Sequence, residues 1–159
     1  MKDIASFTID HTKLLPGVYV SRKDSIGSET LTTFDLRFTR PNIEPALENA
    51  PIHAIEHLGA TFLRNDSKWA DKIIYFGPMG CRTGFYLILA GNYESKDIIE
   101  LLKKMCDFIN DFKGPIPGAT AKGCGNYQDM NLETAQFHIK HWKDMLDTID
   151  DKHMGYPGE

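Results

Sequence analysis

The chain has 159 residues, of which 42% are hydrophobic and 25% are charged. This length suits one domain spanning residues 1–159, because two halves would each have too small a core to be stable. The net charge of -4, with lysines and arginines scattered singly, gives no general attraction for nucleic acid. No apolar stretch approaches the roughly 20 residues that span a bilayer, and residues 1–3 begin no signal peptide. We therefore expect a globular cytoplasmic protein that binds neither nucleic acid nor a membrane.

Two extended segments come first, at residues 18–21 and 30–38. The second alternates between apolar and polar residues, with Arg37 on the polar face, which predicts a strand buried on one side. Three prolines then prevent a continuous helix, but Pro51 is well placed as the first residue of a helix that runs through about Arg64.

Two apolar runs flank a turn rich in glycine and proline that holds Cys81, and they predict strands at 73–76 and 83–90. Ser95 is expected to cap a helix with a core-facing apolar stripe. A loop at 114–129 then precedes a last amphipathic helix. This order predicts an α+β fold, in which helices cover a mostly antiparallel sheet.

The segment His53-Ala-Ile-Glu56-His57 carries the first chemical signal. On a helix, its two imidazoles lie on one face about 5–6 Å apart, close enough to share a metal ion. The pattern H-x-x-E-H is the inverted zincin signature, in which the Glu acts as acid or base. A catalytic site also needs a third ligand and an open position, and Cys124 between two glycines is a suitable thiolate donor. Taken singly, these residues also fit ordinary half-buried histidines and a free loop thiol.

The three cysteines form an odd set without a C-x-x-C pair, which argues against a disulfide framework and a four-cysteine zinc site. Cys106 falls on the apolar stripe of its helix and is interpreted as a core residue. Cys81 lies on a turn, where a thiol is exposed. We predict that the pKa of Cys81 is lowered, with help from Arg82 or from the metal.

Several motifs between residues 6 and 142 occur together in register. They are Ser6-Phe-Thr-Ile-Asp-His11, Phe34-Asp-Leu-Arg37-Phe38, His53-Ala-Ile-Glu56-His57-Leu58, Pro78-Met-Gly-Cys81-Arg-Thr-Gly84-Phe-Tyr86 and Cys124-Gly125. In this order they resemble the LuxS family of S-ribosylhomocysteine lyases. The agreement extends over nearly the whole chain and is far more specific than the histidine pair alone.

The resemblance implies a single catalytic domain that cleaves S-ribosylhomocysteine to homocysteine and dihydroxypentanedione, the precursor of autoinducer-2, in the methyl cycle. It implies one divalent metal per subunit, Fe2+ in the native enzyme and replaceable by Zn2+ or Co2+. The family's metal ligands match His53, His57 and Cys124. Its two proton-transfer residues match Glu56 and Cys81.

The family's substrate-contact residues match Ser6, His11 and Arg37, and its active form is a homodimer with sites at the subunit interface. The chain departs from the family pattern shortly before Cys81. There the family commonly has an Asp and a Ser, and this chain has Tyr75 and Gly77. We interpret the departure as a change in rate or stability rather than a loss of activity.

Two other functions fit part of the sequence. An inverted zincin metallopeptidase would complete its metal site with Glu133, 76 positions beyond His57 (133 − 57), but it would leave the motifs around Cys81 and Cys124 unexplained. A structural metal-binding module would need four protein ligands, and three good ones are apparent.

Overall fold

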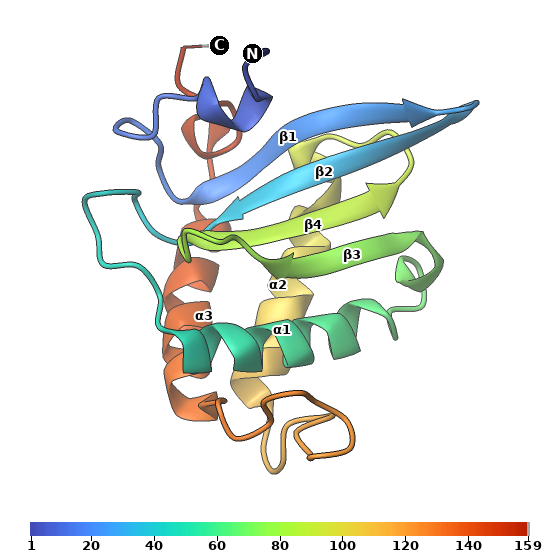
Figure 1. The fold of residues 1–159 in the computed structure, drawn as a ribbon, viewed down its shortest axis with the longest axis vertical. Helices are drawn as coiled ribbons and strands as arrows, with labels where there is room; N and C mark the ends of the chain where they lie inside the picture. Colours follow the sequence, from blue (N-terminus) through green and yellow to red (C-terminus); the bar gives the residue numbers. More distant parts are fainter. Residues whose placement is uncertain (159) are drawn as a thin grey trace.

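Four strands form one antiparallel sheet in the computed structural model, which describes residues 1–158 (Figure 1). They are β1 (Gly17–Ile26), β2 (Glu29–Arg37), β3 (Ile73–Pro78) and β4 (Gly84–Ala90), in the order β1-β2-β4-β3. The α+β fold with an antiparallel sheet is therefore confirmed. β1 is longer than the predicted segment 18–21, because its second half pairs polar residues with β2, such as Lys23 with Thr32, and these carry no hydrophobic alternation.

Three α-helices cover one face of this sheet (Figure 1). They are α1 (Asn49–Leu63), α2 (Ser95–Asp111) and α3 (Leu132–Asp147), with short 3-10 turns η1 (Ala5–Phe7), η2 (Ala70–Lys72) and η3 (Asp151–His153). No helix within residues 1–158 is both long and apolar enough to pass through a bilayer.

The core lies between the sheet and the helices. Phe34 and Leu36 on β2, and Phe85 and Leu87 on β4, are fully buried there. From α3, the Trp142 ring stacks on Phe38 with a centroid distance of 4.3 Å. The Trp142 indole N–H also donates to the backbone carbonyl of Arg37 at 2.9 Å. These contacts fix α3 against the end of β2, where the polar side chains of the site begin.

Two predicted helix starts differ from the structure. α1 begins two residues before Pro51, and proline is tolerated there because N–H groups in the first turn have no partner within the helix. The prediction that Ser95 caps α2 is wrong. The cap is Glu94, whose backbone N–H donates to the Asp97 carboxylate at 2.8 Å, while the Asp97 N–H donates to the Glu94 carbonyl oxygen at 3.0 Å. Ser95 is the first helical residue, buried, and its hydroxyl has no partner.

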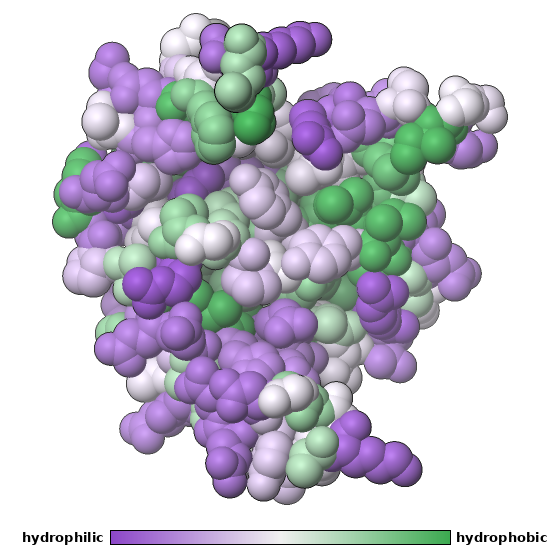
Figure 2. Space-filling view, in the orientation of Figure 1, coloured by the Kyte–Doolittle hydropathy of each residue, from purple (hydrophilic) through white to green (hydrophobic). Residues whose placement is uncertain are grey.

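Within residues 1–158, the other face of the sheet carries no α-helix. At one end it is covered by the two chain termini, which lie side by side (Figure 1): Tyr156 stacks on Tyr19 with ring centroids 4.8 Å apart. Toward the other end, Ile26, Ile74 and Tyr75 are exposed, and Figure 2 shows hydrophobic side chains gathered over that end of the strands.

Candidate active site

The predicted metal ligands come together. The ligand atoms of His53, His57 and Cys124 all lie within 4.8 Å of one another. The first two lie one turn apart on α1, and the third is brought to them by the loop between α2 and α3. The Cys124 Sγ is 3.3 Å from the Nε2 of His53, and all three residues are half-buried.

Two backbone carbonyls orient the imidazoles. The Nδ1 of His53 is 2.9 Å from the carbonyl oxygen of Asp129, and the Nδ1 of His57 is 2.7 Å from that of Pro117. A carbonyl oxygen only accepts, so each Nδ1 carries the proton and each Nε2 presents its lone pair. Fixing the tautomer through the second ring nitrogen is the usual arrangement around metal-bound histidine.

This group fits a divalent metal. Two neutral imidazoles and a thiolate suit Zn2+ and Fe2+. A tetrahedral ion with the usual bond lengths separates a nitrogen from a sulfur ligand by roughly 3.5 Å, close to the 3.3 Å between His53 Nε2 and Cys124 Sγ. The backbone N–H of Asn126 donates to the sulfur at 3.4 Å. Three protein ligands are characteristic of catalytic metal sites, which keep one position open.

Glu56 lies beside this group. Helical spacing places it on the same side of α1 as the two histidines. With His57 it lines an open cleft that Pro117 and Gly118 also line. Glu56 is not one of the three residues of the ligand group. Glu133, the ligand required by the peptidase alternative, is exposed in the first turn of α3 and is not part of the group.

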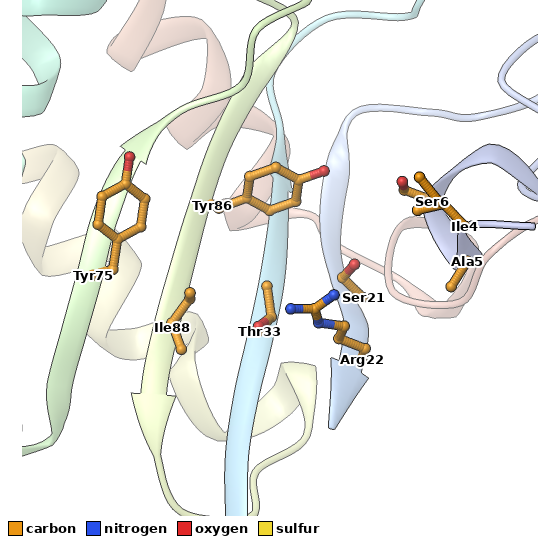
Figure 3. A pocket seen from close by; sticks show the side chains of 9 residues that line it. All are labelled: Ile4, Ala5, Ser6, Ser21, Arg22, Thr33, Tyr75, Tyr86 and Ile88. Carbon is orange, nitrogen blue, oxygen red and sulfur yellow. The ribbon is translucent and has the colours of Figure 1, made fainter. Parts of the chain in front are cut away.

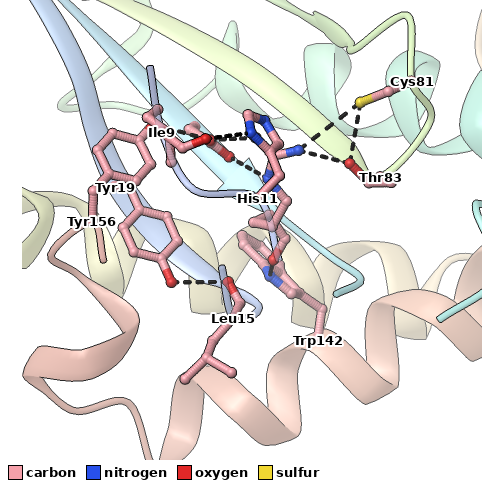
Figure 4. A network of polar contacts seen from close by, with 10 residues as sticks. Ile9, His11, Leu15, Tyr19, Cys81, Thr83, Trp142 and Tyr156 are labelled. Carbon is pink, nitrogen blue, oxygen red and sulfur yellow. Dashed lines mark hydrogen bonds and ion pairs between the residues drawn. The ribbon is translucent and has the colours of Figure 1, made fainter. Parts of the chain in front are cut away.

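Cys81 belongs to a second polar group, which lies where β2 ends and β4 begins. Its Sγ is 3.1 Å from the hydroxyl of Thr83 and 3.9 Å from Nη1 of Arg37 (Figure 4). The same Nη1 donates to the Thr83 hydroxyl at 2.7 Å. Gly84 makes this arrangement possible, because it pairs with Arg37 across β2 and β4, and a Cβ on it would overlap the carbonyl oxygen of Leu36.

A buried ion pair holds Arg37 in place. Its Nε and Nη2 donate to the two carboxylate oxygens of Asp35 at 3.1 and 2.5 Å, and the side chains are 3% and 2% exposed. The hydroxyl of Tyr156 donates to the same carboxylate at 3.0 Å. Asp35 therefore fixes the Nε and Nη2 side of the guanidinium, and Nη1 is directed toward Thr83 and Cys81.

The pKa of Cys81 is lowered from its ordinary value. Partial burial alone would raise it, but hydrogen bonds from Thr83 and the charge of Arg37 outweigh burial. The lowering was predicted, but the source differs: the cation is Arg37, whereas Arg82 donates to the carbonyl of Leu47. Cys81 is exposed and Cys106 is buried, both as predicted, and burial raises the pKa of Cys106.

The other predicted substrate contacts lie on the open face of the sheet. Ser6 lines a cavity of about 250 Å³ together with residues of β1, β2, β3 and β4. Figure 3 shows the Tyr86 hydroxyl pointing across it toward the N-terminal segment. The Nδ1 of His11 is 2.8 Å from the carbonyl oxygen of Ile9. Burial raises the pKa of Asp35, and His11 is close enough to oppose that rise slightly, after the larger opposing effect of Arg37.

The two departures from the family pattern form one structural unit. The ring of Tyr75 lies across Gly77, so that a Cβ at position 77 would overlap its hydroxyl. Tyr75 also forms a wall of the cavity that Ser6 lines. Gly77 thus permits the Tyr75 side chain to lie flat on the strand. The predicted effect on rate or stability stays a prediction.

The two groups of side chains are separate within residues 1–158. No hydrogen bond or ion pair in this part of the chain joins Cys81 and Arg37 to His53, His57 or Cys124. One group is carried by α1 and the loop after α2, and the other by the ends of β2 and β4.

Sequence reasoning missed the residues that orient these groups. The carbonyls of Pro117 and Asp129 act through the backbone, which leaves no signal in side-chain type. Thr83, Asp35 and Tyr156 are ordinary polar residues whose partners lie 46, 2 and 121 positions away. Only the alternation of β2, which puts Asp35 and Arg37 on one face, could have indicated that pair.

Fold and site together define an α+β metalloenzyme with a two-histidine, one-cysteine metal site. The family model described as S-ribosylhomocysteinase (LuxS) matches residues 4–153. The chain is 60% identical over 158 residues to an S-ribosylhomocysteine lyase from Clostridium beijerinckii, covering 99% of each chain. It is 58% identical to one from Clostridium acetobutylicum, again covering 99% of each. It is 57% identical to one from Borreliella afzelii, covering 99% of this chain and all of that one. The chain therefore belongs to the S-ribosylhomocysteinase (LuxS) family.

Proposed function

We propose that this protein is an S-ribosylhomocysteine lyase. The observation that carries the proposal is the group of His53, His57 and Cys124, in which both imidazoles are already turned to present Nε2. It occurs in a chain that shares 55–60% identity over nearly its whole length with relatives that bear this name.

The reaction needs an isomerisation before the C–S bond can break. Moving the sugar carbonyl along the chain acidifies the next proton and makes the thiolate a β-leaving group, so that elimination gives homocysteine and dihydroxypentanedione. His53, His57 and Cys124 would hold the divalent metal, Fe2+ in the cell by resemblance and Zn2+ or Co2+ as substitutes. When bound, it supplies Lewis-acid stabilisation of charge developing on sugar oxygens.

The remaining residues have proposed roles in proton transfer and binding. Cys81, as a thiolate, takes a proton from one sugar carbon and returns it to another, which is worth about 10²–10⁴-fold in rate. Glu56 moves protons between substrate oxygens. Ser6, His11 and Arg37 contact the substrate. The lowered pKa of Cys81 and the placement of Glu56 in the cleft beside His57 support these roles.

We further propose that the active form is a homodimer in which each site uses both subunits. Two observations support it. Within residues 1–158 the Cys81 group makes no hydrogen bond to the metal group, although the reaction needs both at one sugar. The helix-free face of the sheet exposes Ile26 and Ile74, and apolar side chains of this kind are typically covered in an assembly.

The test of the function is thiol release. Anaerobically purified protein is mixed with S-ribosylhomocysteine, and homocysteine is detected with a chromogenic disulfide. Release by the metal-loaded protein and its loss on chelation are expected. A fully metallated protein that releases no thiol would overturn the proposal. Formation of the autoinducer-2 precursor, measured on the same samples, tests the second product; the cytoplasmic location stays a prediction.

The shared site has its own test. Cys81→Ala and Cys124→Ala subunits carry different tags and are co-expressed, and the mixed dimers are isolated on both tags. If each site combines the two subunits, one site per mixed dimer is intact and about half the wild-type activity returns, while each homodimer stays inactive. Mixed dimers as inactive as the homodimers would show that each site lies within one subunit.

A further inference from the structure

We propose that Thr83 is a positioning residue that directs its hydroxyl proton at the sulfur of Cys81 and so keeps this thiol ionised near neutral pH. The role of the thiolate in turnover rests on the proposed function, whereas the state of the thiol can be measured without any substrate. Three atoms lie together at this site: Nη1 of Arg37, the hydroxyl oxygen of Thr83 and Sγ of Cys81 (Figure 4).

The Thr83 side chain is buried and held by its own backbone. Thr83 is 6% exposed. Its carbonyl oxygen accepts N–H bonds from Phe38 and Thr39 at 2.9 and 3.2 Å, which ties it to the chain just beyond β2. Arg82, which precedes it, has a φ of 59°, in the left-handed region, so the turn bends sharply between Cys81 and Thr83. The hydroxyl is therefore placed between the guanidinium and the sulfur by the backbone itself.

The direction of the hydroxyl proton follows from its two neighbours. Arg37 has only N–H donors, so the Thr83 oxygen must accept from Nη1 at 2.7 Å. That leaves its own O–H free to donate to Cys81, whose Sγ is 3.1 Å away. A hydrogen bond donated to the charged form stabilises it, whereas the sulfur of a neutral thiol is only a weak acceptor and gains less from the same donor. The arrangement consequently favours the thiolate.

The other polar and charged groups near the Cys81 sulfur do not provide the hydrogen bond that the Thr83 hydroxyl donates. The Arg37 Nη1 is itself 3.9 Å from the sulfur, a long contact, and its charge is balanced from behind by Asp35. From β4, Tyr86 faces the same site, and burial is the main cause of its raised pKa, so it is neutral near pH 7. Arg82 is directed to the carbonyl of Leu47. Thr83 is thus the short, direct donor to Cys81.

The test compares three variants in the full-length, metal-loaded protein. Thr83→Val removes the hydroxyl and nearly preserves shape, and Thr83→Ser restores it. Thr39→Val is the matched control, because the Thr39 hydroxyl is also buried nearby but has no hydrogen-bond partner. The readouts are the pH dependence of alkylation at Cys81, located by mass spectrometry, and the thiolate absorbance at equilibrium.

We expect Thr83→Val to raise the alkylation midpoint by about one pH unit and to slow alkylation near pH 7 up to about tenfold. Thr83→Ser and Thr39→Val should keep the wild-type midpoint. An unchanged midpoint in Thr83→Val would overturn the proposal. If Thr83→Val does not fold, Thr83→Ala takes its place, with the same expectation. A wild-type protein with a low midpoint that releases no homocysteine would overturn the lyase function and leave this inference standing.

Discussion

Replacing Asp35 with Asn should destabilise the protein strongly, although the change adds or removes almost no volume. Asp35 and Arg37 are 2% and 3% exposed, and the carboxylate receives three hydrogen bonds, two from Arg37 and one from Tyr156. Asn removes the negative charge and leaves a buried guanidinium without its counter-ion. Breaking one partner of such a pair typically costs about 3–5 kcal/mol. This is a large part of the ordinary stability of about 5–15 kcal/mol.

An exposed ion pair of the same sheet provides the matched control. Asp24 accepts from Arg22 at 2.8 Å, but the side chains are 45% and 61% exposed, and pairs of this kind contribute about 0–1 kcal/mol. Asp24→Asn should therefore change stability little. Tyr156→Phe keeps the stack on Tyr19 and removes one hydrogen bond to the carboxylate. Its loss of stability should lie between the losses in Asp35→Asn and Asp24→Asn.

The assay is urea unfolding of the metal-loaded proteins at one fixed protomer concentration, because association contributes to the apparent stability of a dimer. The dependence of the unfolding free energy on urea concentration is compared across variants. Where this slope is unchanged, a change in the midpoint reports a change in stability. Equal losses in Asp35→Asn and Asp24→Asn would refute the reasoning, since they would show that the buried guanidinium tolerates the loss of its counter-ion. A double variant that replaces both Asp35 and Arg37 with apolar residues should recover part of the loss.

Three further outcomes are expected at the site. Because the pKa of Cys81 is lowered, alkylation at this thiol should rise with pH through a midpoint below that of free cysteine, while the buried Cys106 stays unmodified; equal labelling of the two, read by mass spectrometry, would contradict the assignment. Cys124→Ala should lose bound metal and Glu133→Ala should retain it, as measured by elemental analysis; the reverse result would favour the peptidase. Glu56→Gln should keep the metal and abolish thiol release, and turnover retained in this variant would remove Glu56 from the mechanism.

The sequence predicted the parts of this protein that depend on local patterns. The turn holding Cys81 and the strands beside it follow from glycine, proline and hydrophobic alternation. The pairing of His53 with His57 follows from helical spacing alone. The start of α2 was misjudged, because Ser, Asp and Glu all occur at residues 94–97, and the choice among them depends on which side chain can reach the backbone N–H groups.

The orientation of the site residues could not be predicted in the same way. The tautomers of the two histidines depend on carbonyls 60 and 76 positions away. Which arginine approaches Cys81 depends on the register between β2 and β4, since the pairing of Arg37 with Gly84 brings one guanidinium to the thiol. The neighbouring Arg82 is closer in sequence but has a positive φ, and its side chain leaves toward Leu47. Closeness in sequence did not predict the contact, because the turn directs the side chains of the neighbouring residues Cys81 and Arg82 to different places.

The Cys81 group and the metal ligands are held in place by different kinds of structure. The thiol is held by a buried ion pair and a strand register, which include none of the three metal ligands. The metal ligands instead join α1 to the loop between α2 and α3, which has no strand or helix. Apart from Cys124 itself, that loop's hydrogen bonds with the two histidines come from backbone carbonyls. Metal binding should therefore order the loop and contribute to folding free energy, whereas it should leave the Cys81 group unchanged. Hydrogen exchange on metal-free and metal-loaded protein would then differ at residues 114–131 and agree along β2 and β4; a difference along both strands would show that the two supports are coupled.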